Sequence, residues 1–360
     1  MNIFLITNHS FMLYKFRKEL IQQLLVNHHV TLVMPAREYT DAFRQMGCNI
    51  MDVDVDRRGI NPLTDYRLLR TYRRILKQHH PDMVLTYSIK PNIYAGMAAA
   101  KLRIPYCANI TGLGTAFQKP LLARFVTVLY RYAFRKVKTV FFENQSNLNE
   151  FLNRSILKKE KTCLLDGAGV NLQEFHCEAY PEDSTTNFIF VGRIMKEKGI
   201  DELLEAFRRL EDDHEQVHLD IVGPFEDDYK EEMNKIEHDP SCRYCGFQND
   251  VRPFLAKAHC LVLPSYHEGM ANTILEAAAC SRAVIASDIP GCKEGIKDQR
   301  SGYLVNVKDA NDLYEKMKRF THLTNEEKRQ MGREGRKLME QKFDKQKVVD
   351  QTVSAIERQE

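Results

Sequence analysis

The feature that most constrains this chain is a regular alternation of short apolar runs with amphipathic stretches. In the first half, near-continuous apolar runs are separated by stretches in which apolar residues recur at helical spacing. Because apolar strands that alternate with helices form βαβ units, we expect a parallel sheet covered by helices on both faces. The expected strands are 2–7, 30–35, 83–87, 105–111 and 139–143, and the expected helices are about 14–26, 64–79, 92–102, 121–137 and 145–153.

The second half of the chain repeats this pattern after a polar, proline-containing stretch at 178–187. Its expected strands are 187–192, 217–222, 261–264 and 283–287. The fold class predicted is therefore α/β, with two doubly wound Rossmann-like domains that face each other across a cleft, where ligands bind beyond the carboxyl ends of the strands. The expected boundaries are an N-terminal domain at 1–177, a linker at 178–187, a C-terminal domain at 188–344, and a helix at 345–360 that packs on either domain, including back on the first.

Composition excludes several classes of protein and divides the chain by charge. With 43% hydrophobic and 28% charged residues, the chain is neither disordered nor fibrous. Residues 1–180 contain 25 Lys and Arg against 14 Asp and Glu, whereas residues 181–360 contain 27 against 35. This asymmetry predicts an anionic partner for the first half. Nine cysteines, no apolar run long enough to span a bilayer and no secretory signal predict a protein of the cytoplasm.

The strongest constellation of polar residues runs from Tyr266 to Glu276, directly after an expected strand. Glu268 falls in the strand-to-helix loop, and the next helix opens near Asn272. Because the first N–H groups of a helix lack intrahelical partners, this helix start suits a diphosphate. Glu276, about one turn into the helix, can accept hydrogen bonds from ribose, and Glu268 from a sugar ring. Alternatively, both are ordinary solvated glutamates.

A second constellation follows the first strand of the second half. Gly192 and Arg193 end this strand, and Lys198 and Gly199 open the next helix. Two fixed cations at the carboxyl edge of a sheet would neutralise a departing diphosphate without a metal ion. The alternative interpretation is a solvated loop.

Together the two segments resemble glycosyltransferase family 4, whose members carry a G-R-x-x-x-x-K-G loop followed by an E-x7-E motif in the C-terminal half of a GT-B fold. The segments 90–117 and FFENQSN are similar to a bacterial branch that assembles lipid-linked glycans, O-antigen or capsule, including N-acetylgalactosaminyltransferases acting on undecaprenyl-diphosphate sugars. The resemblance implies a retaining, metal-independent hexosyltransferase without a cofactor. It implies a UDP-sugar donor, carrying an N-acetylhexosamine or hexose, and a polyprenyl-diphosphate-linked sugar as the acceptor.

The resemblance also implies roles for individual residues. Arg193 and Lys198 would clamp the diphosphate, and Glu268 would hold the donor sugar. The implied donor-binding residues are Gly192, Tyr244, Phe247, Gly269, Met270, Ala271, Asn272, Thr273 and Glu276, and the candidate acceptor contacts are Arg17, Lys90, Asn92, Thr111 and Gly112. Many relatives have a histidine in the acceptor-side segment where this chain has Ile110-Thr111-Gly112, so a histidine-dependent mechanism is not expected here.

The stretch 119–138 contains six basic residues and no acid. It is either an ordinary helix buried on one side or a helix that lies against anionic lipid headgroups. The second interpretation predicts a peripheral contact of the N-terminal domain with the inner face of the cell membrane.

Two further residue patterns have the spacing of metal sites, and other functions are compatible with the sequence. The acids at 52, 54 and 56 have the D-x-D spacing of a metal site but fit the polar face of an edge strand better. Cys242 and Cys245 form a lone C-x-x-C pair without the further ligands that zinc needs. The rival functions are a UDP-N-acetylglucosamine 2-epimerase on the same fold, a non-catalytic nucleotide-sugar-binding protein and, on electrostatics alone, a nucleic-acid binder, which the acidic second half disfavours.

Overall fold

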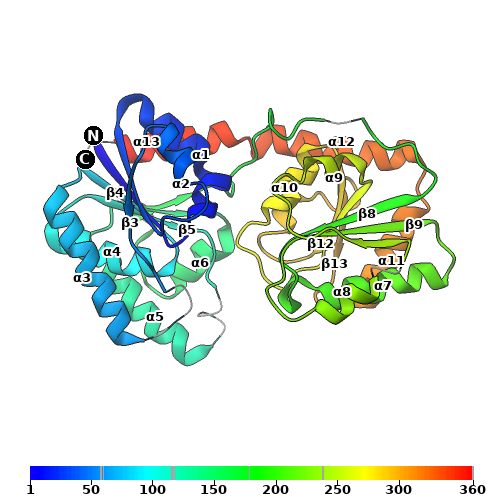
Figure 1. Ribbon diagram of the computed structural model, residues 1–360, viewed down its shortest axis with the longest axis horizontal. Helices are drawn as coiled ribbons and strands as arrows, with labels where there is room; N and C mark the ends of the chain where they lie inside the picture. The colour runs from blue at the N-terminus through cyan, green and yellow to red at the C-terminus, as the bar shows by residue number, and fades with distance from the viewer. Residues whose placement is uncertain are drawn as a thin grey trace. The chain divides into compact units, whose positions relative to one another are not determined.

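The computed structural model describes residues 1–56, 59, 61–114, 117, 119–177, 179–236 and 239–358 of the 360-residue chain. It divides into two compact units, each with its own sheet (Figure 1). Unit 1 comprises Met1–Ala168 and Lys345–Glu360, and unit 2 comprises Gly169–Asp344. The two doubly wound domains expected from the sequence are therefore present.

Unit 1 contains a sheet that is parallel throughout, with the order β3-β2-β1-β4-β5-β6-β7. Its strands are β1 (Asn2–Ile6), β2 (His29–Met34), β3 (Asn49–Asp52), β4 (Met83–Tyr87), β5 (Tyr106–Ile110), β6 (Thr139–Phe142) and β7 (Thr162–Leu164). Its helices are α1 (Ser10–Asn27), α2 (Thr40–Gln45), α3 (Pro62–His79), α4 (Ile89–Leu102), α5 (Pro120–Ala133), α6 (Gln145–Asn153) and α13 (Lys345–Glu357). The strand order reverses direction between β1 and β4, which is where a doubly wound sheet opens a ligand site.

Two apolar layers hold this sheet between its helices. One core joins the sheet to α3, α4, α5 and α6, and the other joins it to α1, α2 and α13. Figure 1 shows α3, α4 and α5 on one side of the sheet, and α1 and α13 on the other. The strands β1, β4 and β5 are almost wholly buried, which explains their near-continuous apolar sequences.

Unit 2 is built in the same way around a parallel sheet with the order β10-β9-β8-β11-β12-β13. Its strands are β8 (Thr186–Val191), β9 (Val217–Val222), β10 (Cys242–Tyr244), β11 (Cys260–Leu263), β12 (Ala283–Ser287) and β13 (Gly302–Val305). Its helices are α7 (Ile200–Asp212), α8 (Lys230–Ile236), α9 (Arg252–Lys257), α10 (Asn272–Ala279), α11 (Ala310–Thr321) and α12 (Asn325–Lys342). Here the strand order reverses between β8 and β11.

The structure differs from the sequence analysis at the domain boundary and in the short strands. The stretch 178–187 was expected to be the linker, but residues 169–177 already belong to unit 2. There Val170 forms a β-bridge with Asp344, and the Arg336 guanidinium donates to the Phe175 carbonyl at 2.8 Å. The strands β7, β10 and β13 were not predicted because they have only three or four residues and, unlike the equally short β6 and β11, lie at the edges of their sheets, where a strand need not be continuously apolar.

The strand β3 is an edge strand, and Asp52 at its end accepts a hydrogen bond from the Ala36 N–H at 2.9 Å. Of the three acids expected on this strand, Asp54 and Asp56 lie beyond its end. The sequence left open which domain the last helix packs on, and α13 contacts α1 within unit 1.

His259, just before β11, is a fully buried imidazole in unit 2. The Asn187 N–H donates to its Nδ1 at 3.0 Å, so the neutral ring carries its proton on Nε2. Burial, reinforced by the nearby Lys328 ammonium, lowers the pKa of His259 to about 4. His259 in the unfolded chain therefore binds a proton below about pH 6.5, whereas in the folded chain it stays neutral down to about pH 4.

We expect unit 2 to lose stability between pH 6.5 and pH 4 because of His259. Because folding lowers the pKa of His259 from 6.5 to about 4, the free energy of unfolding should be roughly 3 kcal/mol smaller at pH 4 than at pH 7. Urea unfolding followed through the amide protection of β8 and β11 should show this loss in the wild type and a much smaller one in His259→Gln. An identical pH dependence in both proteins would show that His259 is not responsible.

Candidate active site

The loops that follow β8 and β11 flank the point where the second sheet reverses its strand order. The loop after β8 contains Arg193, whose side chain is half exposed and lies 3.6 Å from Glu226. The backbone reaches this position because Gly223, at a φ of +151°, lies so close to the Gly192 carbonyl that a Cβ would be 1.7 Å from its oxygen. The loops after β8 and β9 therefore depend on a glycine for their contact.

The loop after β8 continues through a short 3-10 helix, Lys196–Lys198, onto the loop after β11. Gly199, with a φ of +71°, makes this approach possible, because a Cβ there would lie 2.1 Å from the Pro264 carbonyl oxygen. The Tyr266 N–H donates to the Glu197 carbonyl at 2.9 Å. Two segments 70 residues apart in sequence are thus joined by backbone contacts.

The side chains of Lys198 and Glu268 form an ion pair at this junction. They are only 16% and 11% exposed, so the pair is largely shielded from water. Sequence analysis predicted both residues as parts of the site, and the structure brings them into direct contact. The pair places a cation and a carboxylate at the carboxyl edge of the sheet, where each can also bind a polar ligand.

The first turn of α10 lies directly after Glu268. The Ala271 N–H is already used, because it donates to the Gly291 carbonyl at 2.8 Å. The next N–H groups, at Asn272 and Thr273, stand in the first turn and have no intrahelical acceptor. Among the described residues, the buried Asn272 Oδ1 also has no hydrogen-bond partner. The start of α10 therefore offers donors and one acceptor to a ligand.

The other residues predicted to bind the donor are placed around this helix start. Glu276 is half-buried within α10, one turn after Asn272. The side chain of Met270 is buried in the core against α12, so it could contact a ligand only through its backbone. The Gly269 and Glu268 carbonyls pack against Gly291.

Tyr244 is the last residue of β10 and Phe247 lies in the loop that follows, and the strands β9 and β8 separate β10 from β11 in the sheet. The Tyr244 hydroxyl donates to the Gly223 carbonyl at 3.0 Å, and its ring centroid lies 4.9 Å from that of Phe225. Phe247 is 50% exposed. Aromatic surface near the loop after β9 is suited to a nucleobase.

Tyr266 was not predicted to have a role, yet it fixes the loop that carries Glu268. Its hydroxyl donates to Glu202 at 2.7 Å, and the Lys308 ammonium lies 4.8 Å from its ring centroid. Burial, together with the bond to Glu202, raises the pKa of the Tyr266 hydroxyl, so it remains a neutral donor. Its place directly after a strand was the only sequence signal for this role.

The predicted acceptor contacts lie in unit 1. Lys90, at the start of α4 beside the reversal point of the first sheet, pairs with Asp65 at 2.8 Å. Asn92 is buried, and its amide nitrogen donates to the Asn109 carbonyl at 2.8 Å. Thr111 and Gly112 are half-buried directly after β5. Of these residues, Lys90, Thr111 and Gly112 are placed at the carboxyl edge of the sheet.

Arg17, also predicted as an acceptor contact, lies in the interior of unit 1. Its side chain is only 5% exposed and forms an ion pair with Glu143, which follows β6. Its guanidinium carbon also lies 5.5 Å from the centre of the Tyr87 ring. The sequence could not reveal this because Glu143 is 126 residues away. The guanidinium is engaged inside unit 1, and its contact with an acceptor remains a prediction.

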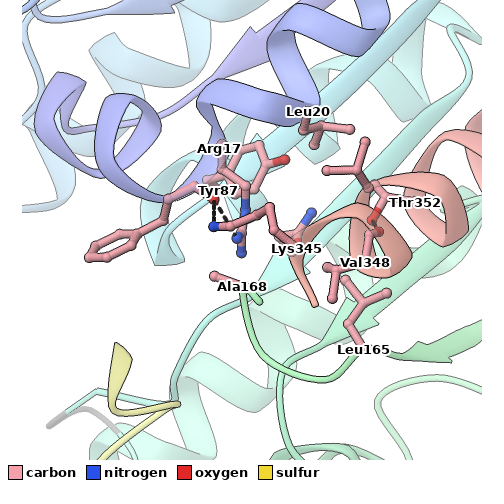
Figure 2. A pocket seen from close by; sticks show the side chains of 11 residues that line it. Arg17, Leu20, Tyr87, Leu165, Ala168, Lys345, Val348 and Thr352 are labelled. Atoms are coloured by element: carbon pink, nitrogen blue, oxygen red, sulfur yellow. Dashed lines mark hydrogen bonds between the residues drawn. The ribbon is translucent and has the colours of Figure 1, made fainter. Parts of the chain in front are cut away.

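A small cavity beside Arg17 extends this interior cluster. It measures about 10 Å³, and Figure 2 shows Arg17, Tyr87 and Lys345 converging on it. The Lys345 side chain is 7% exposed, and its ammonium lies 3.4 Å from the Phe16 carbonyl. A cavity of this size holds one water molecule and not a sugar. The cluster therefore ties α13 to α1.

No group of three or more His, Cys, Asp or Glu side chains in the described parts of the chain is arranged to hold a metal ion. No described helix is both long enough and apolar enough to cross a bilayer.

Comparison with known proteins places this geometry in a family. Residues 18–164 match the model of the glycosyl transferase 4-like domain, and residues 174–338 match that of the glycosyl transferases group 1. An uncharacterised glycosyltransferase of Methanocaldococcus jannaschii is 30% identical over 81% of this chain and 79% of its own. The N,N'-diacetylbacillosaminyl-diphospho-undecaprenol alpha-1,3-N-acetylgalactosaminyltransferase of Campylobacter jejuni is 28% identical over 85% of both chains.

Solved structures of other proteins have the same fold as this chain. A glycosyltransferase of Rickettsia africae superposes with a TM-score of 0.79 at 17% identity, covering 98% of this chain and 97% of its own. HepE of Anabaena, solved with UDP and glucose, gives 0.80 at 16% identity, covering 98% of both chains. The two Rossmann-like units thus have the GT-B fold, as the sequence predicted. The chain belongs to the glycosyltransferases that contain a glycosyl transferase 4-like domain followed by a glycosyl transferases group 1 domain.

We expect the contact at Gly291 to be indispensable to the Glu268 loop. Gly291 has a φ of +90°, and a Cβ there would lie 2.6 Å from the Gly269 carbonyl oxygen. Gly291→Ala should therefore destabilise unit 2 by about 1–3 kcal/mol more than Gly246→Ala does. Gly246 is a matched control because it has a φ of +65° and open space around it, so its substitution adds backbone strain alone. Urea unfolding measures both, and equal losses would mean that the loop accommodates the methyl group.

Proposed function

We propose that this glycosyltransferase transfers an N-acetylhexosamine or a hexose from a UDP-sugar to a polyprenyl-diphosphate-linked sugar in the synthesis of a cell-surface glycan. The observation that carries the proposal is the Lys198–Glu268 pair beside the unsatisfied first turn of α10. A cation, a carboxylate and unpaired N–H groups together match the three parts of a sugar diphosphate: its charge, its hydroxyls and its phosphate oxygens.

The choice of donor is supported by the aromatic end of β10 and by related structures. HepE of Anabaena was solved with UDP and with UDP-glucose. In the proposed complex, Tyr244 and Phe247 hold the base and Glu276 accepts hydrogen bonds from the ribose. The N–H groups of Asn272 and Thr273 donate to the diphosphate.

The choice of acceptor is supported by the names of two relatives. Both Campylobacter jejuni transferases, at 28% and 23% identity, act on undecaprenol-linked diphospho-sugars. In unit 1, the proposed contacts are Lys90, Thr111 and Gly112 at the carboxyl edge of the sheet. The Lys90 ammonium would contact the acceptor diphosphate while it remains paired with Asp65.

The proposed reaction retains the anomeric configuration. The bond between the sugar C1 and the diphosphate oxygen breaks as the acceptor hydroxyl oxygen attacks C1 from the same face. The acceptor proton passes to an oxygen of the departing phosphate, so no protein nucleophile or base is needed. Arg193 and Lys198 stabilise the negative charge that develops on the diphosphate, and Glu268 holds the sugar hydroxyls in position. In this mechanism the two cations supply the charge that a metal ion would otherwise supply.

Transfer of label from a UDP-sugar to a lipid tests this function. We expect labelled sugar from UDP-N-acetylhexosamine or UDP-hexose to enter the organic phase only when an undecaprenyl-diphosphate sugar is present, and to do so equally with EDTA. Lys198→Met should lower kcat about 10²–10³-fold, because it removes a cation aimed at the leaving group. Glu268→Gln should lower kcat/KM, because it removes the carboxylate that orients the sugar.

Glu205→Gln is the matched control, since it neutralises an exposed carboxylate on α7 of the same unit. It should leave the rate unchanged, and circular dichroism should show that all three variants remain folded. Near wild-type turnover in folded Lys198→Met and Glu268→Gln would refute the assigned roles. Label released as free sugar in water without an acceptor would refute the proposed reaction.

A further inference from the structure

Helix α5 has an exposed face that does not resemble the surface of an ordinary soluble helix. Its inner face packs into the core of unit 1 through Ala123, Val126 and Tyr130. On its outer face, four large apolar side chains recur at helical spacing and are 58% to 82% exposed: Leu121, Phe125, Val128 and Tyr132. A contiguous apolar row of this kind marks an interaction surface.

The remaining exposed positions on this face of α5 are cationic. Arg124 and Arg131 lie between the apolar residues, and Arg135 and Lys136 follow in the next turn. The whole stretch 119–138 contains no acid. The outer face of α5 therefore combines apolar bulk with positive charge and has no negative charge of its own.

Helix α3 carries the same combination. Leu63 and Tyr66, in its first two turns, are 69% and 59% exposed. Its further exposed side chains include five cations, at Arg67, Arg70, Arg73, Arg74 and Lys77. Its acid, Asp65, is 15% exposed and is engaged by Lys90 at 2.8 Å and by the Tyr94 hydroxyl at 2.9 Å. That carboxylate is therefore neutralised by its partners and does not oppose the cations.

The two helices belong to one layer of unit 1. Helix α4 contacts both α3 and α5, and all three pack on the same face of the sheet (Figure 1). Helices α3 and α5 follow β3 and β5, so their first turns lie at the carboxyl edge of this parallel sheet. Their apolar ends, with Leu63 and Leu121, are thus at the edge that carries Lys90 and Thr111. We call the exposed apolar and cationic side chains of α3 and α5 the α3–α5 surface.

We propose that the α3–α5 surface docks on an anionic phospholipid bilayer, with its apolar side chains entering the headgroup region and its cations against the lipid phosphates. Charge complementarity selects this partner, because the surface presents cations and apolar bulk together, as interfacial helices do. The inference deepens the proposed function, since it would bring the acceptor edge of unit 1 to the membrane that holds a lipid-linked acceptor. Vesicle binding itself needs neither donor nor acceptor.

Sedimentation of the full chain with vesicles tests the proposal. We expect binding to vesicles of phosphatidylglycerol and phosphatidylcholine, weaker binding in high salt, and little binding to phosphatidylcholine alone. Arg73→Gln with Arg124→Gln should weaken binding about 30-fold, because each cation near an anionic surface contributes about a factor of five. Leu121→Ser with Phe125→Ser should weaken it at least about tenfold, even in high salt. Arg131 is left intact because its Nε donates to the Arg154 carbonyl at 3.2 Å.

The control for charge is Lys158→Gln with Lys159→Gln, which removes two exposed cations of unit 1 outside both helices. It should change binding less than twofold. A wild type that ignores anionic vesicles would overturn the proposal, and so would surface variants that bind like the wild type. A self-associating wild type whose surface variants are monomeric would assign the face to a second copy of the chain and would also overturn it.

Enzymatic assays separate this inference from the proposed function. With the acceptor in vesicles, the surface variants should transfer sugar more slowly than the wild type. With the acceptor in detergent micelles, they should match it. Vesicle binding without any transfer by the wild type would count against the proposed function alone, whereas transfer from vesicles that is insensitive to the variants would count against the docking surface alone.

Discussion

The site in unit 2 depends on the ion pair between Lys198 and Glu268. Each residue comes from a loop that follows a different strand, and the pair closes the two loops over the point where the strand order reverses. Because both side chains are largely shielded from water, leaving either one without its partner would be costly. The surrounding glycines let the backbone come close enough for the pair to form: Gly199 against Pro264 and Gly291 against Gly269. The same arrangement of the two loops leaves the first turn of α10 open to a ligand. The loop contacts that form the Lys198–Glu268 pair therefore also create the proposed binding site.

Unit 1 uses buried charge for a different purpose. Arg17 of α1 and Lys345 of α13 line a cavity no larger than one water molecule, and Arg17 pairs with Glu143, which follows β6. This cluster secures the last helix of the chain to the first unit, after the chain has completed unit 2. The half-buried Thr111 and Gly112 lie at the carboxyl edge of the sheet, near Lys90, which is 12% exposed and paired with Asp65.

Much of the fold could be predicted from the sequence because nine of the strands are long enough or apolar enough to be recognised alone. The segments with Arg193, Lys198, Glu268 and Glu276 could also be found, because their residue types occur at a characteristic spacing shortly after strands. Two kinds of information were missing. Local sequence does not reveal whether a basic residue is buried, so Arg17 could not be distinguished from an exposed cation before Glu143 was located. Nor does it reveal close backbone approaches, which is why the requirement for glycine at 223 and 291 became visible only in three dimensions.

We propose that the carboxyl edge of the second sheet binds uridine diphosphate through Lys198 and the start of α10. Thermal unfolding of unit 2 with UDP, GDP, ADP and CMP, each at saturation, tests this binding. A ligand at 100 times its Kd stabilises the unit that binds it by about 2.7 kcal/mol, which raises the unfolding midpoint by roughly 5–10 °C for a unit of this size. We predict this rise with UDP alone, and a much smaller one in Lys198→Met. No rise with UDP would show that unit 2 does not bind this nucleotide, and an equal rise in the variant would show that Lys198 does not take part.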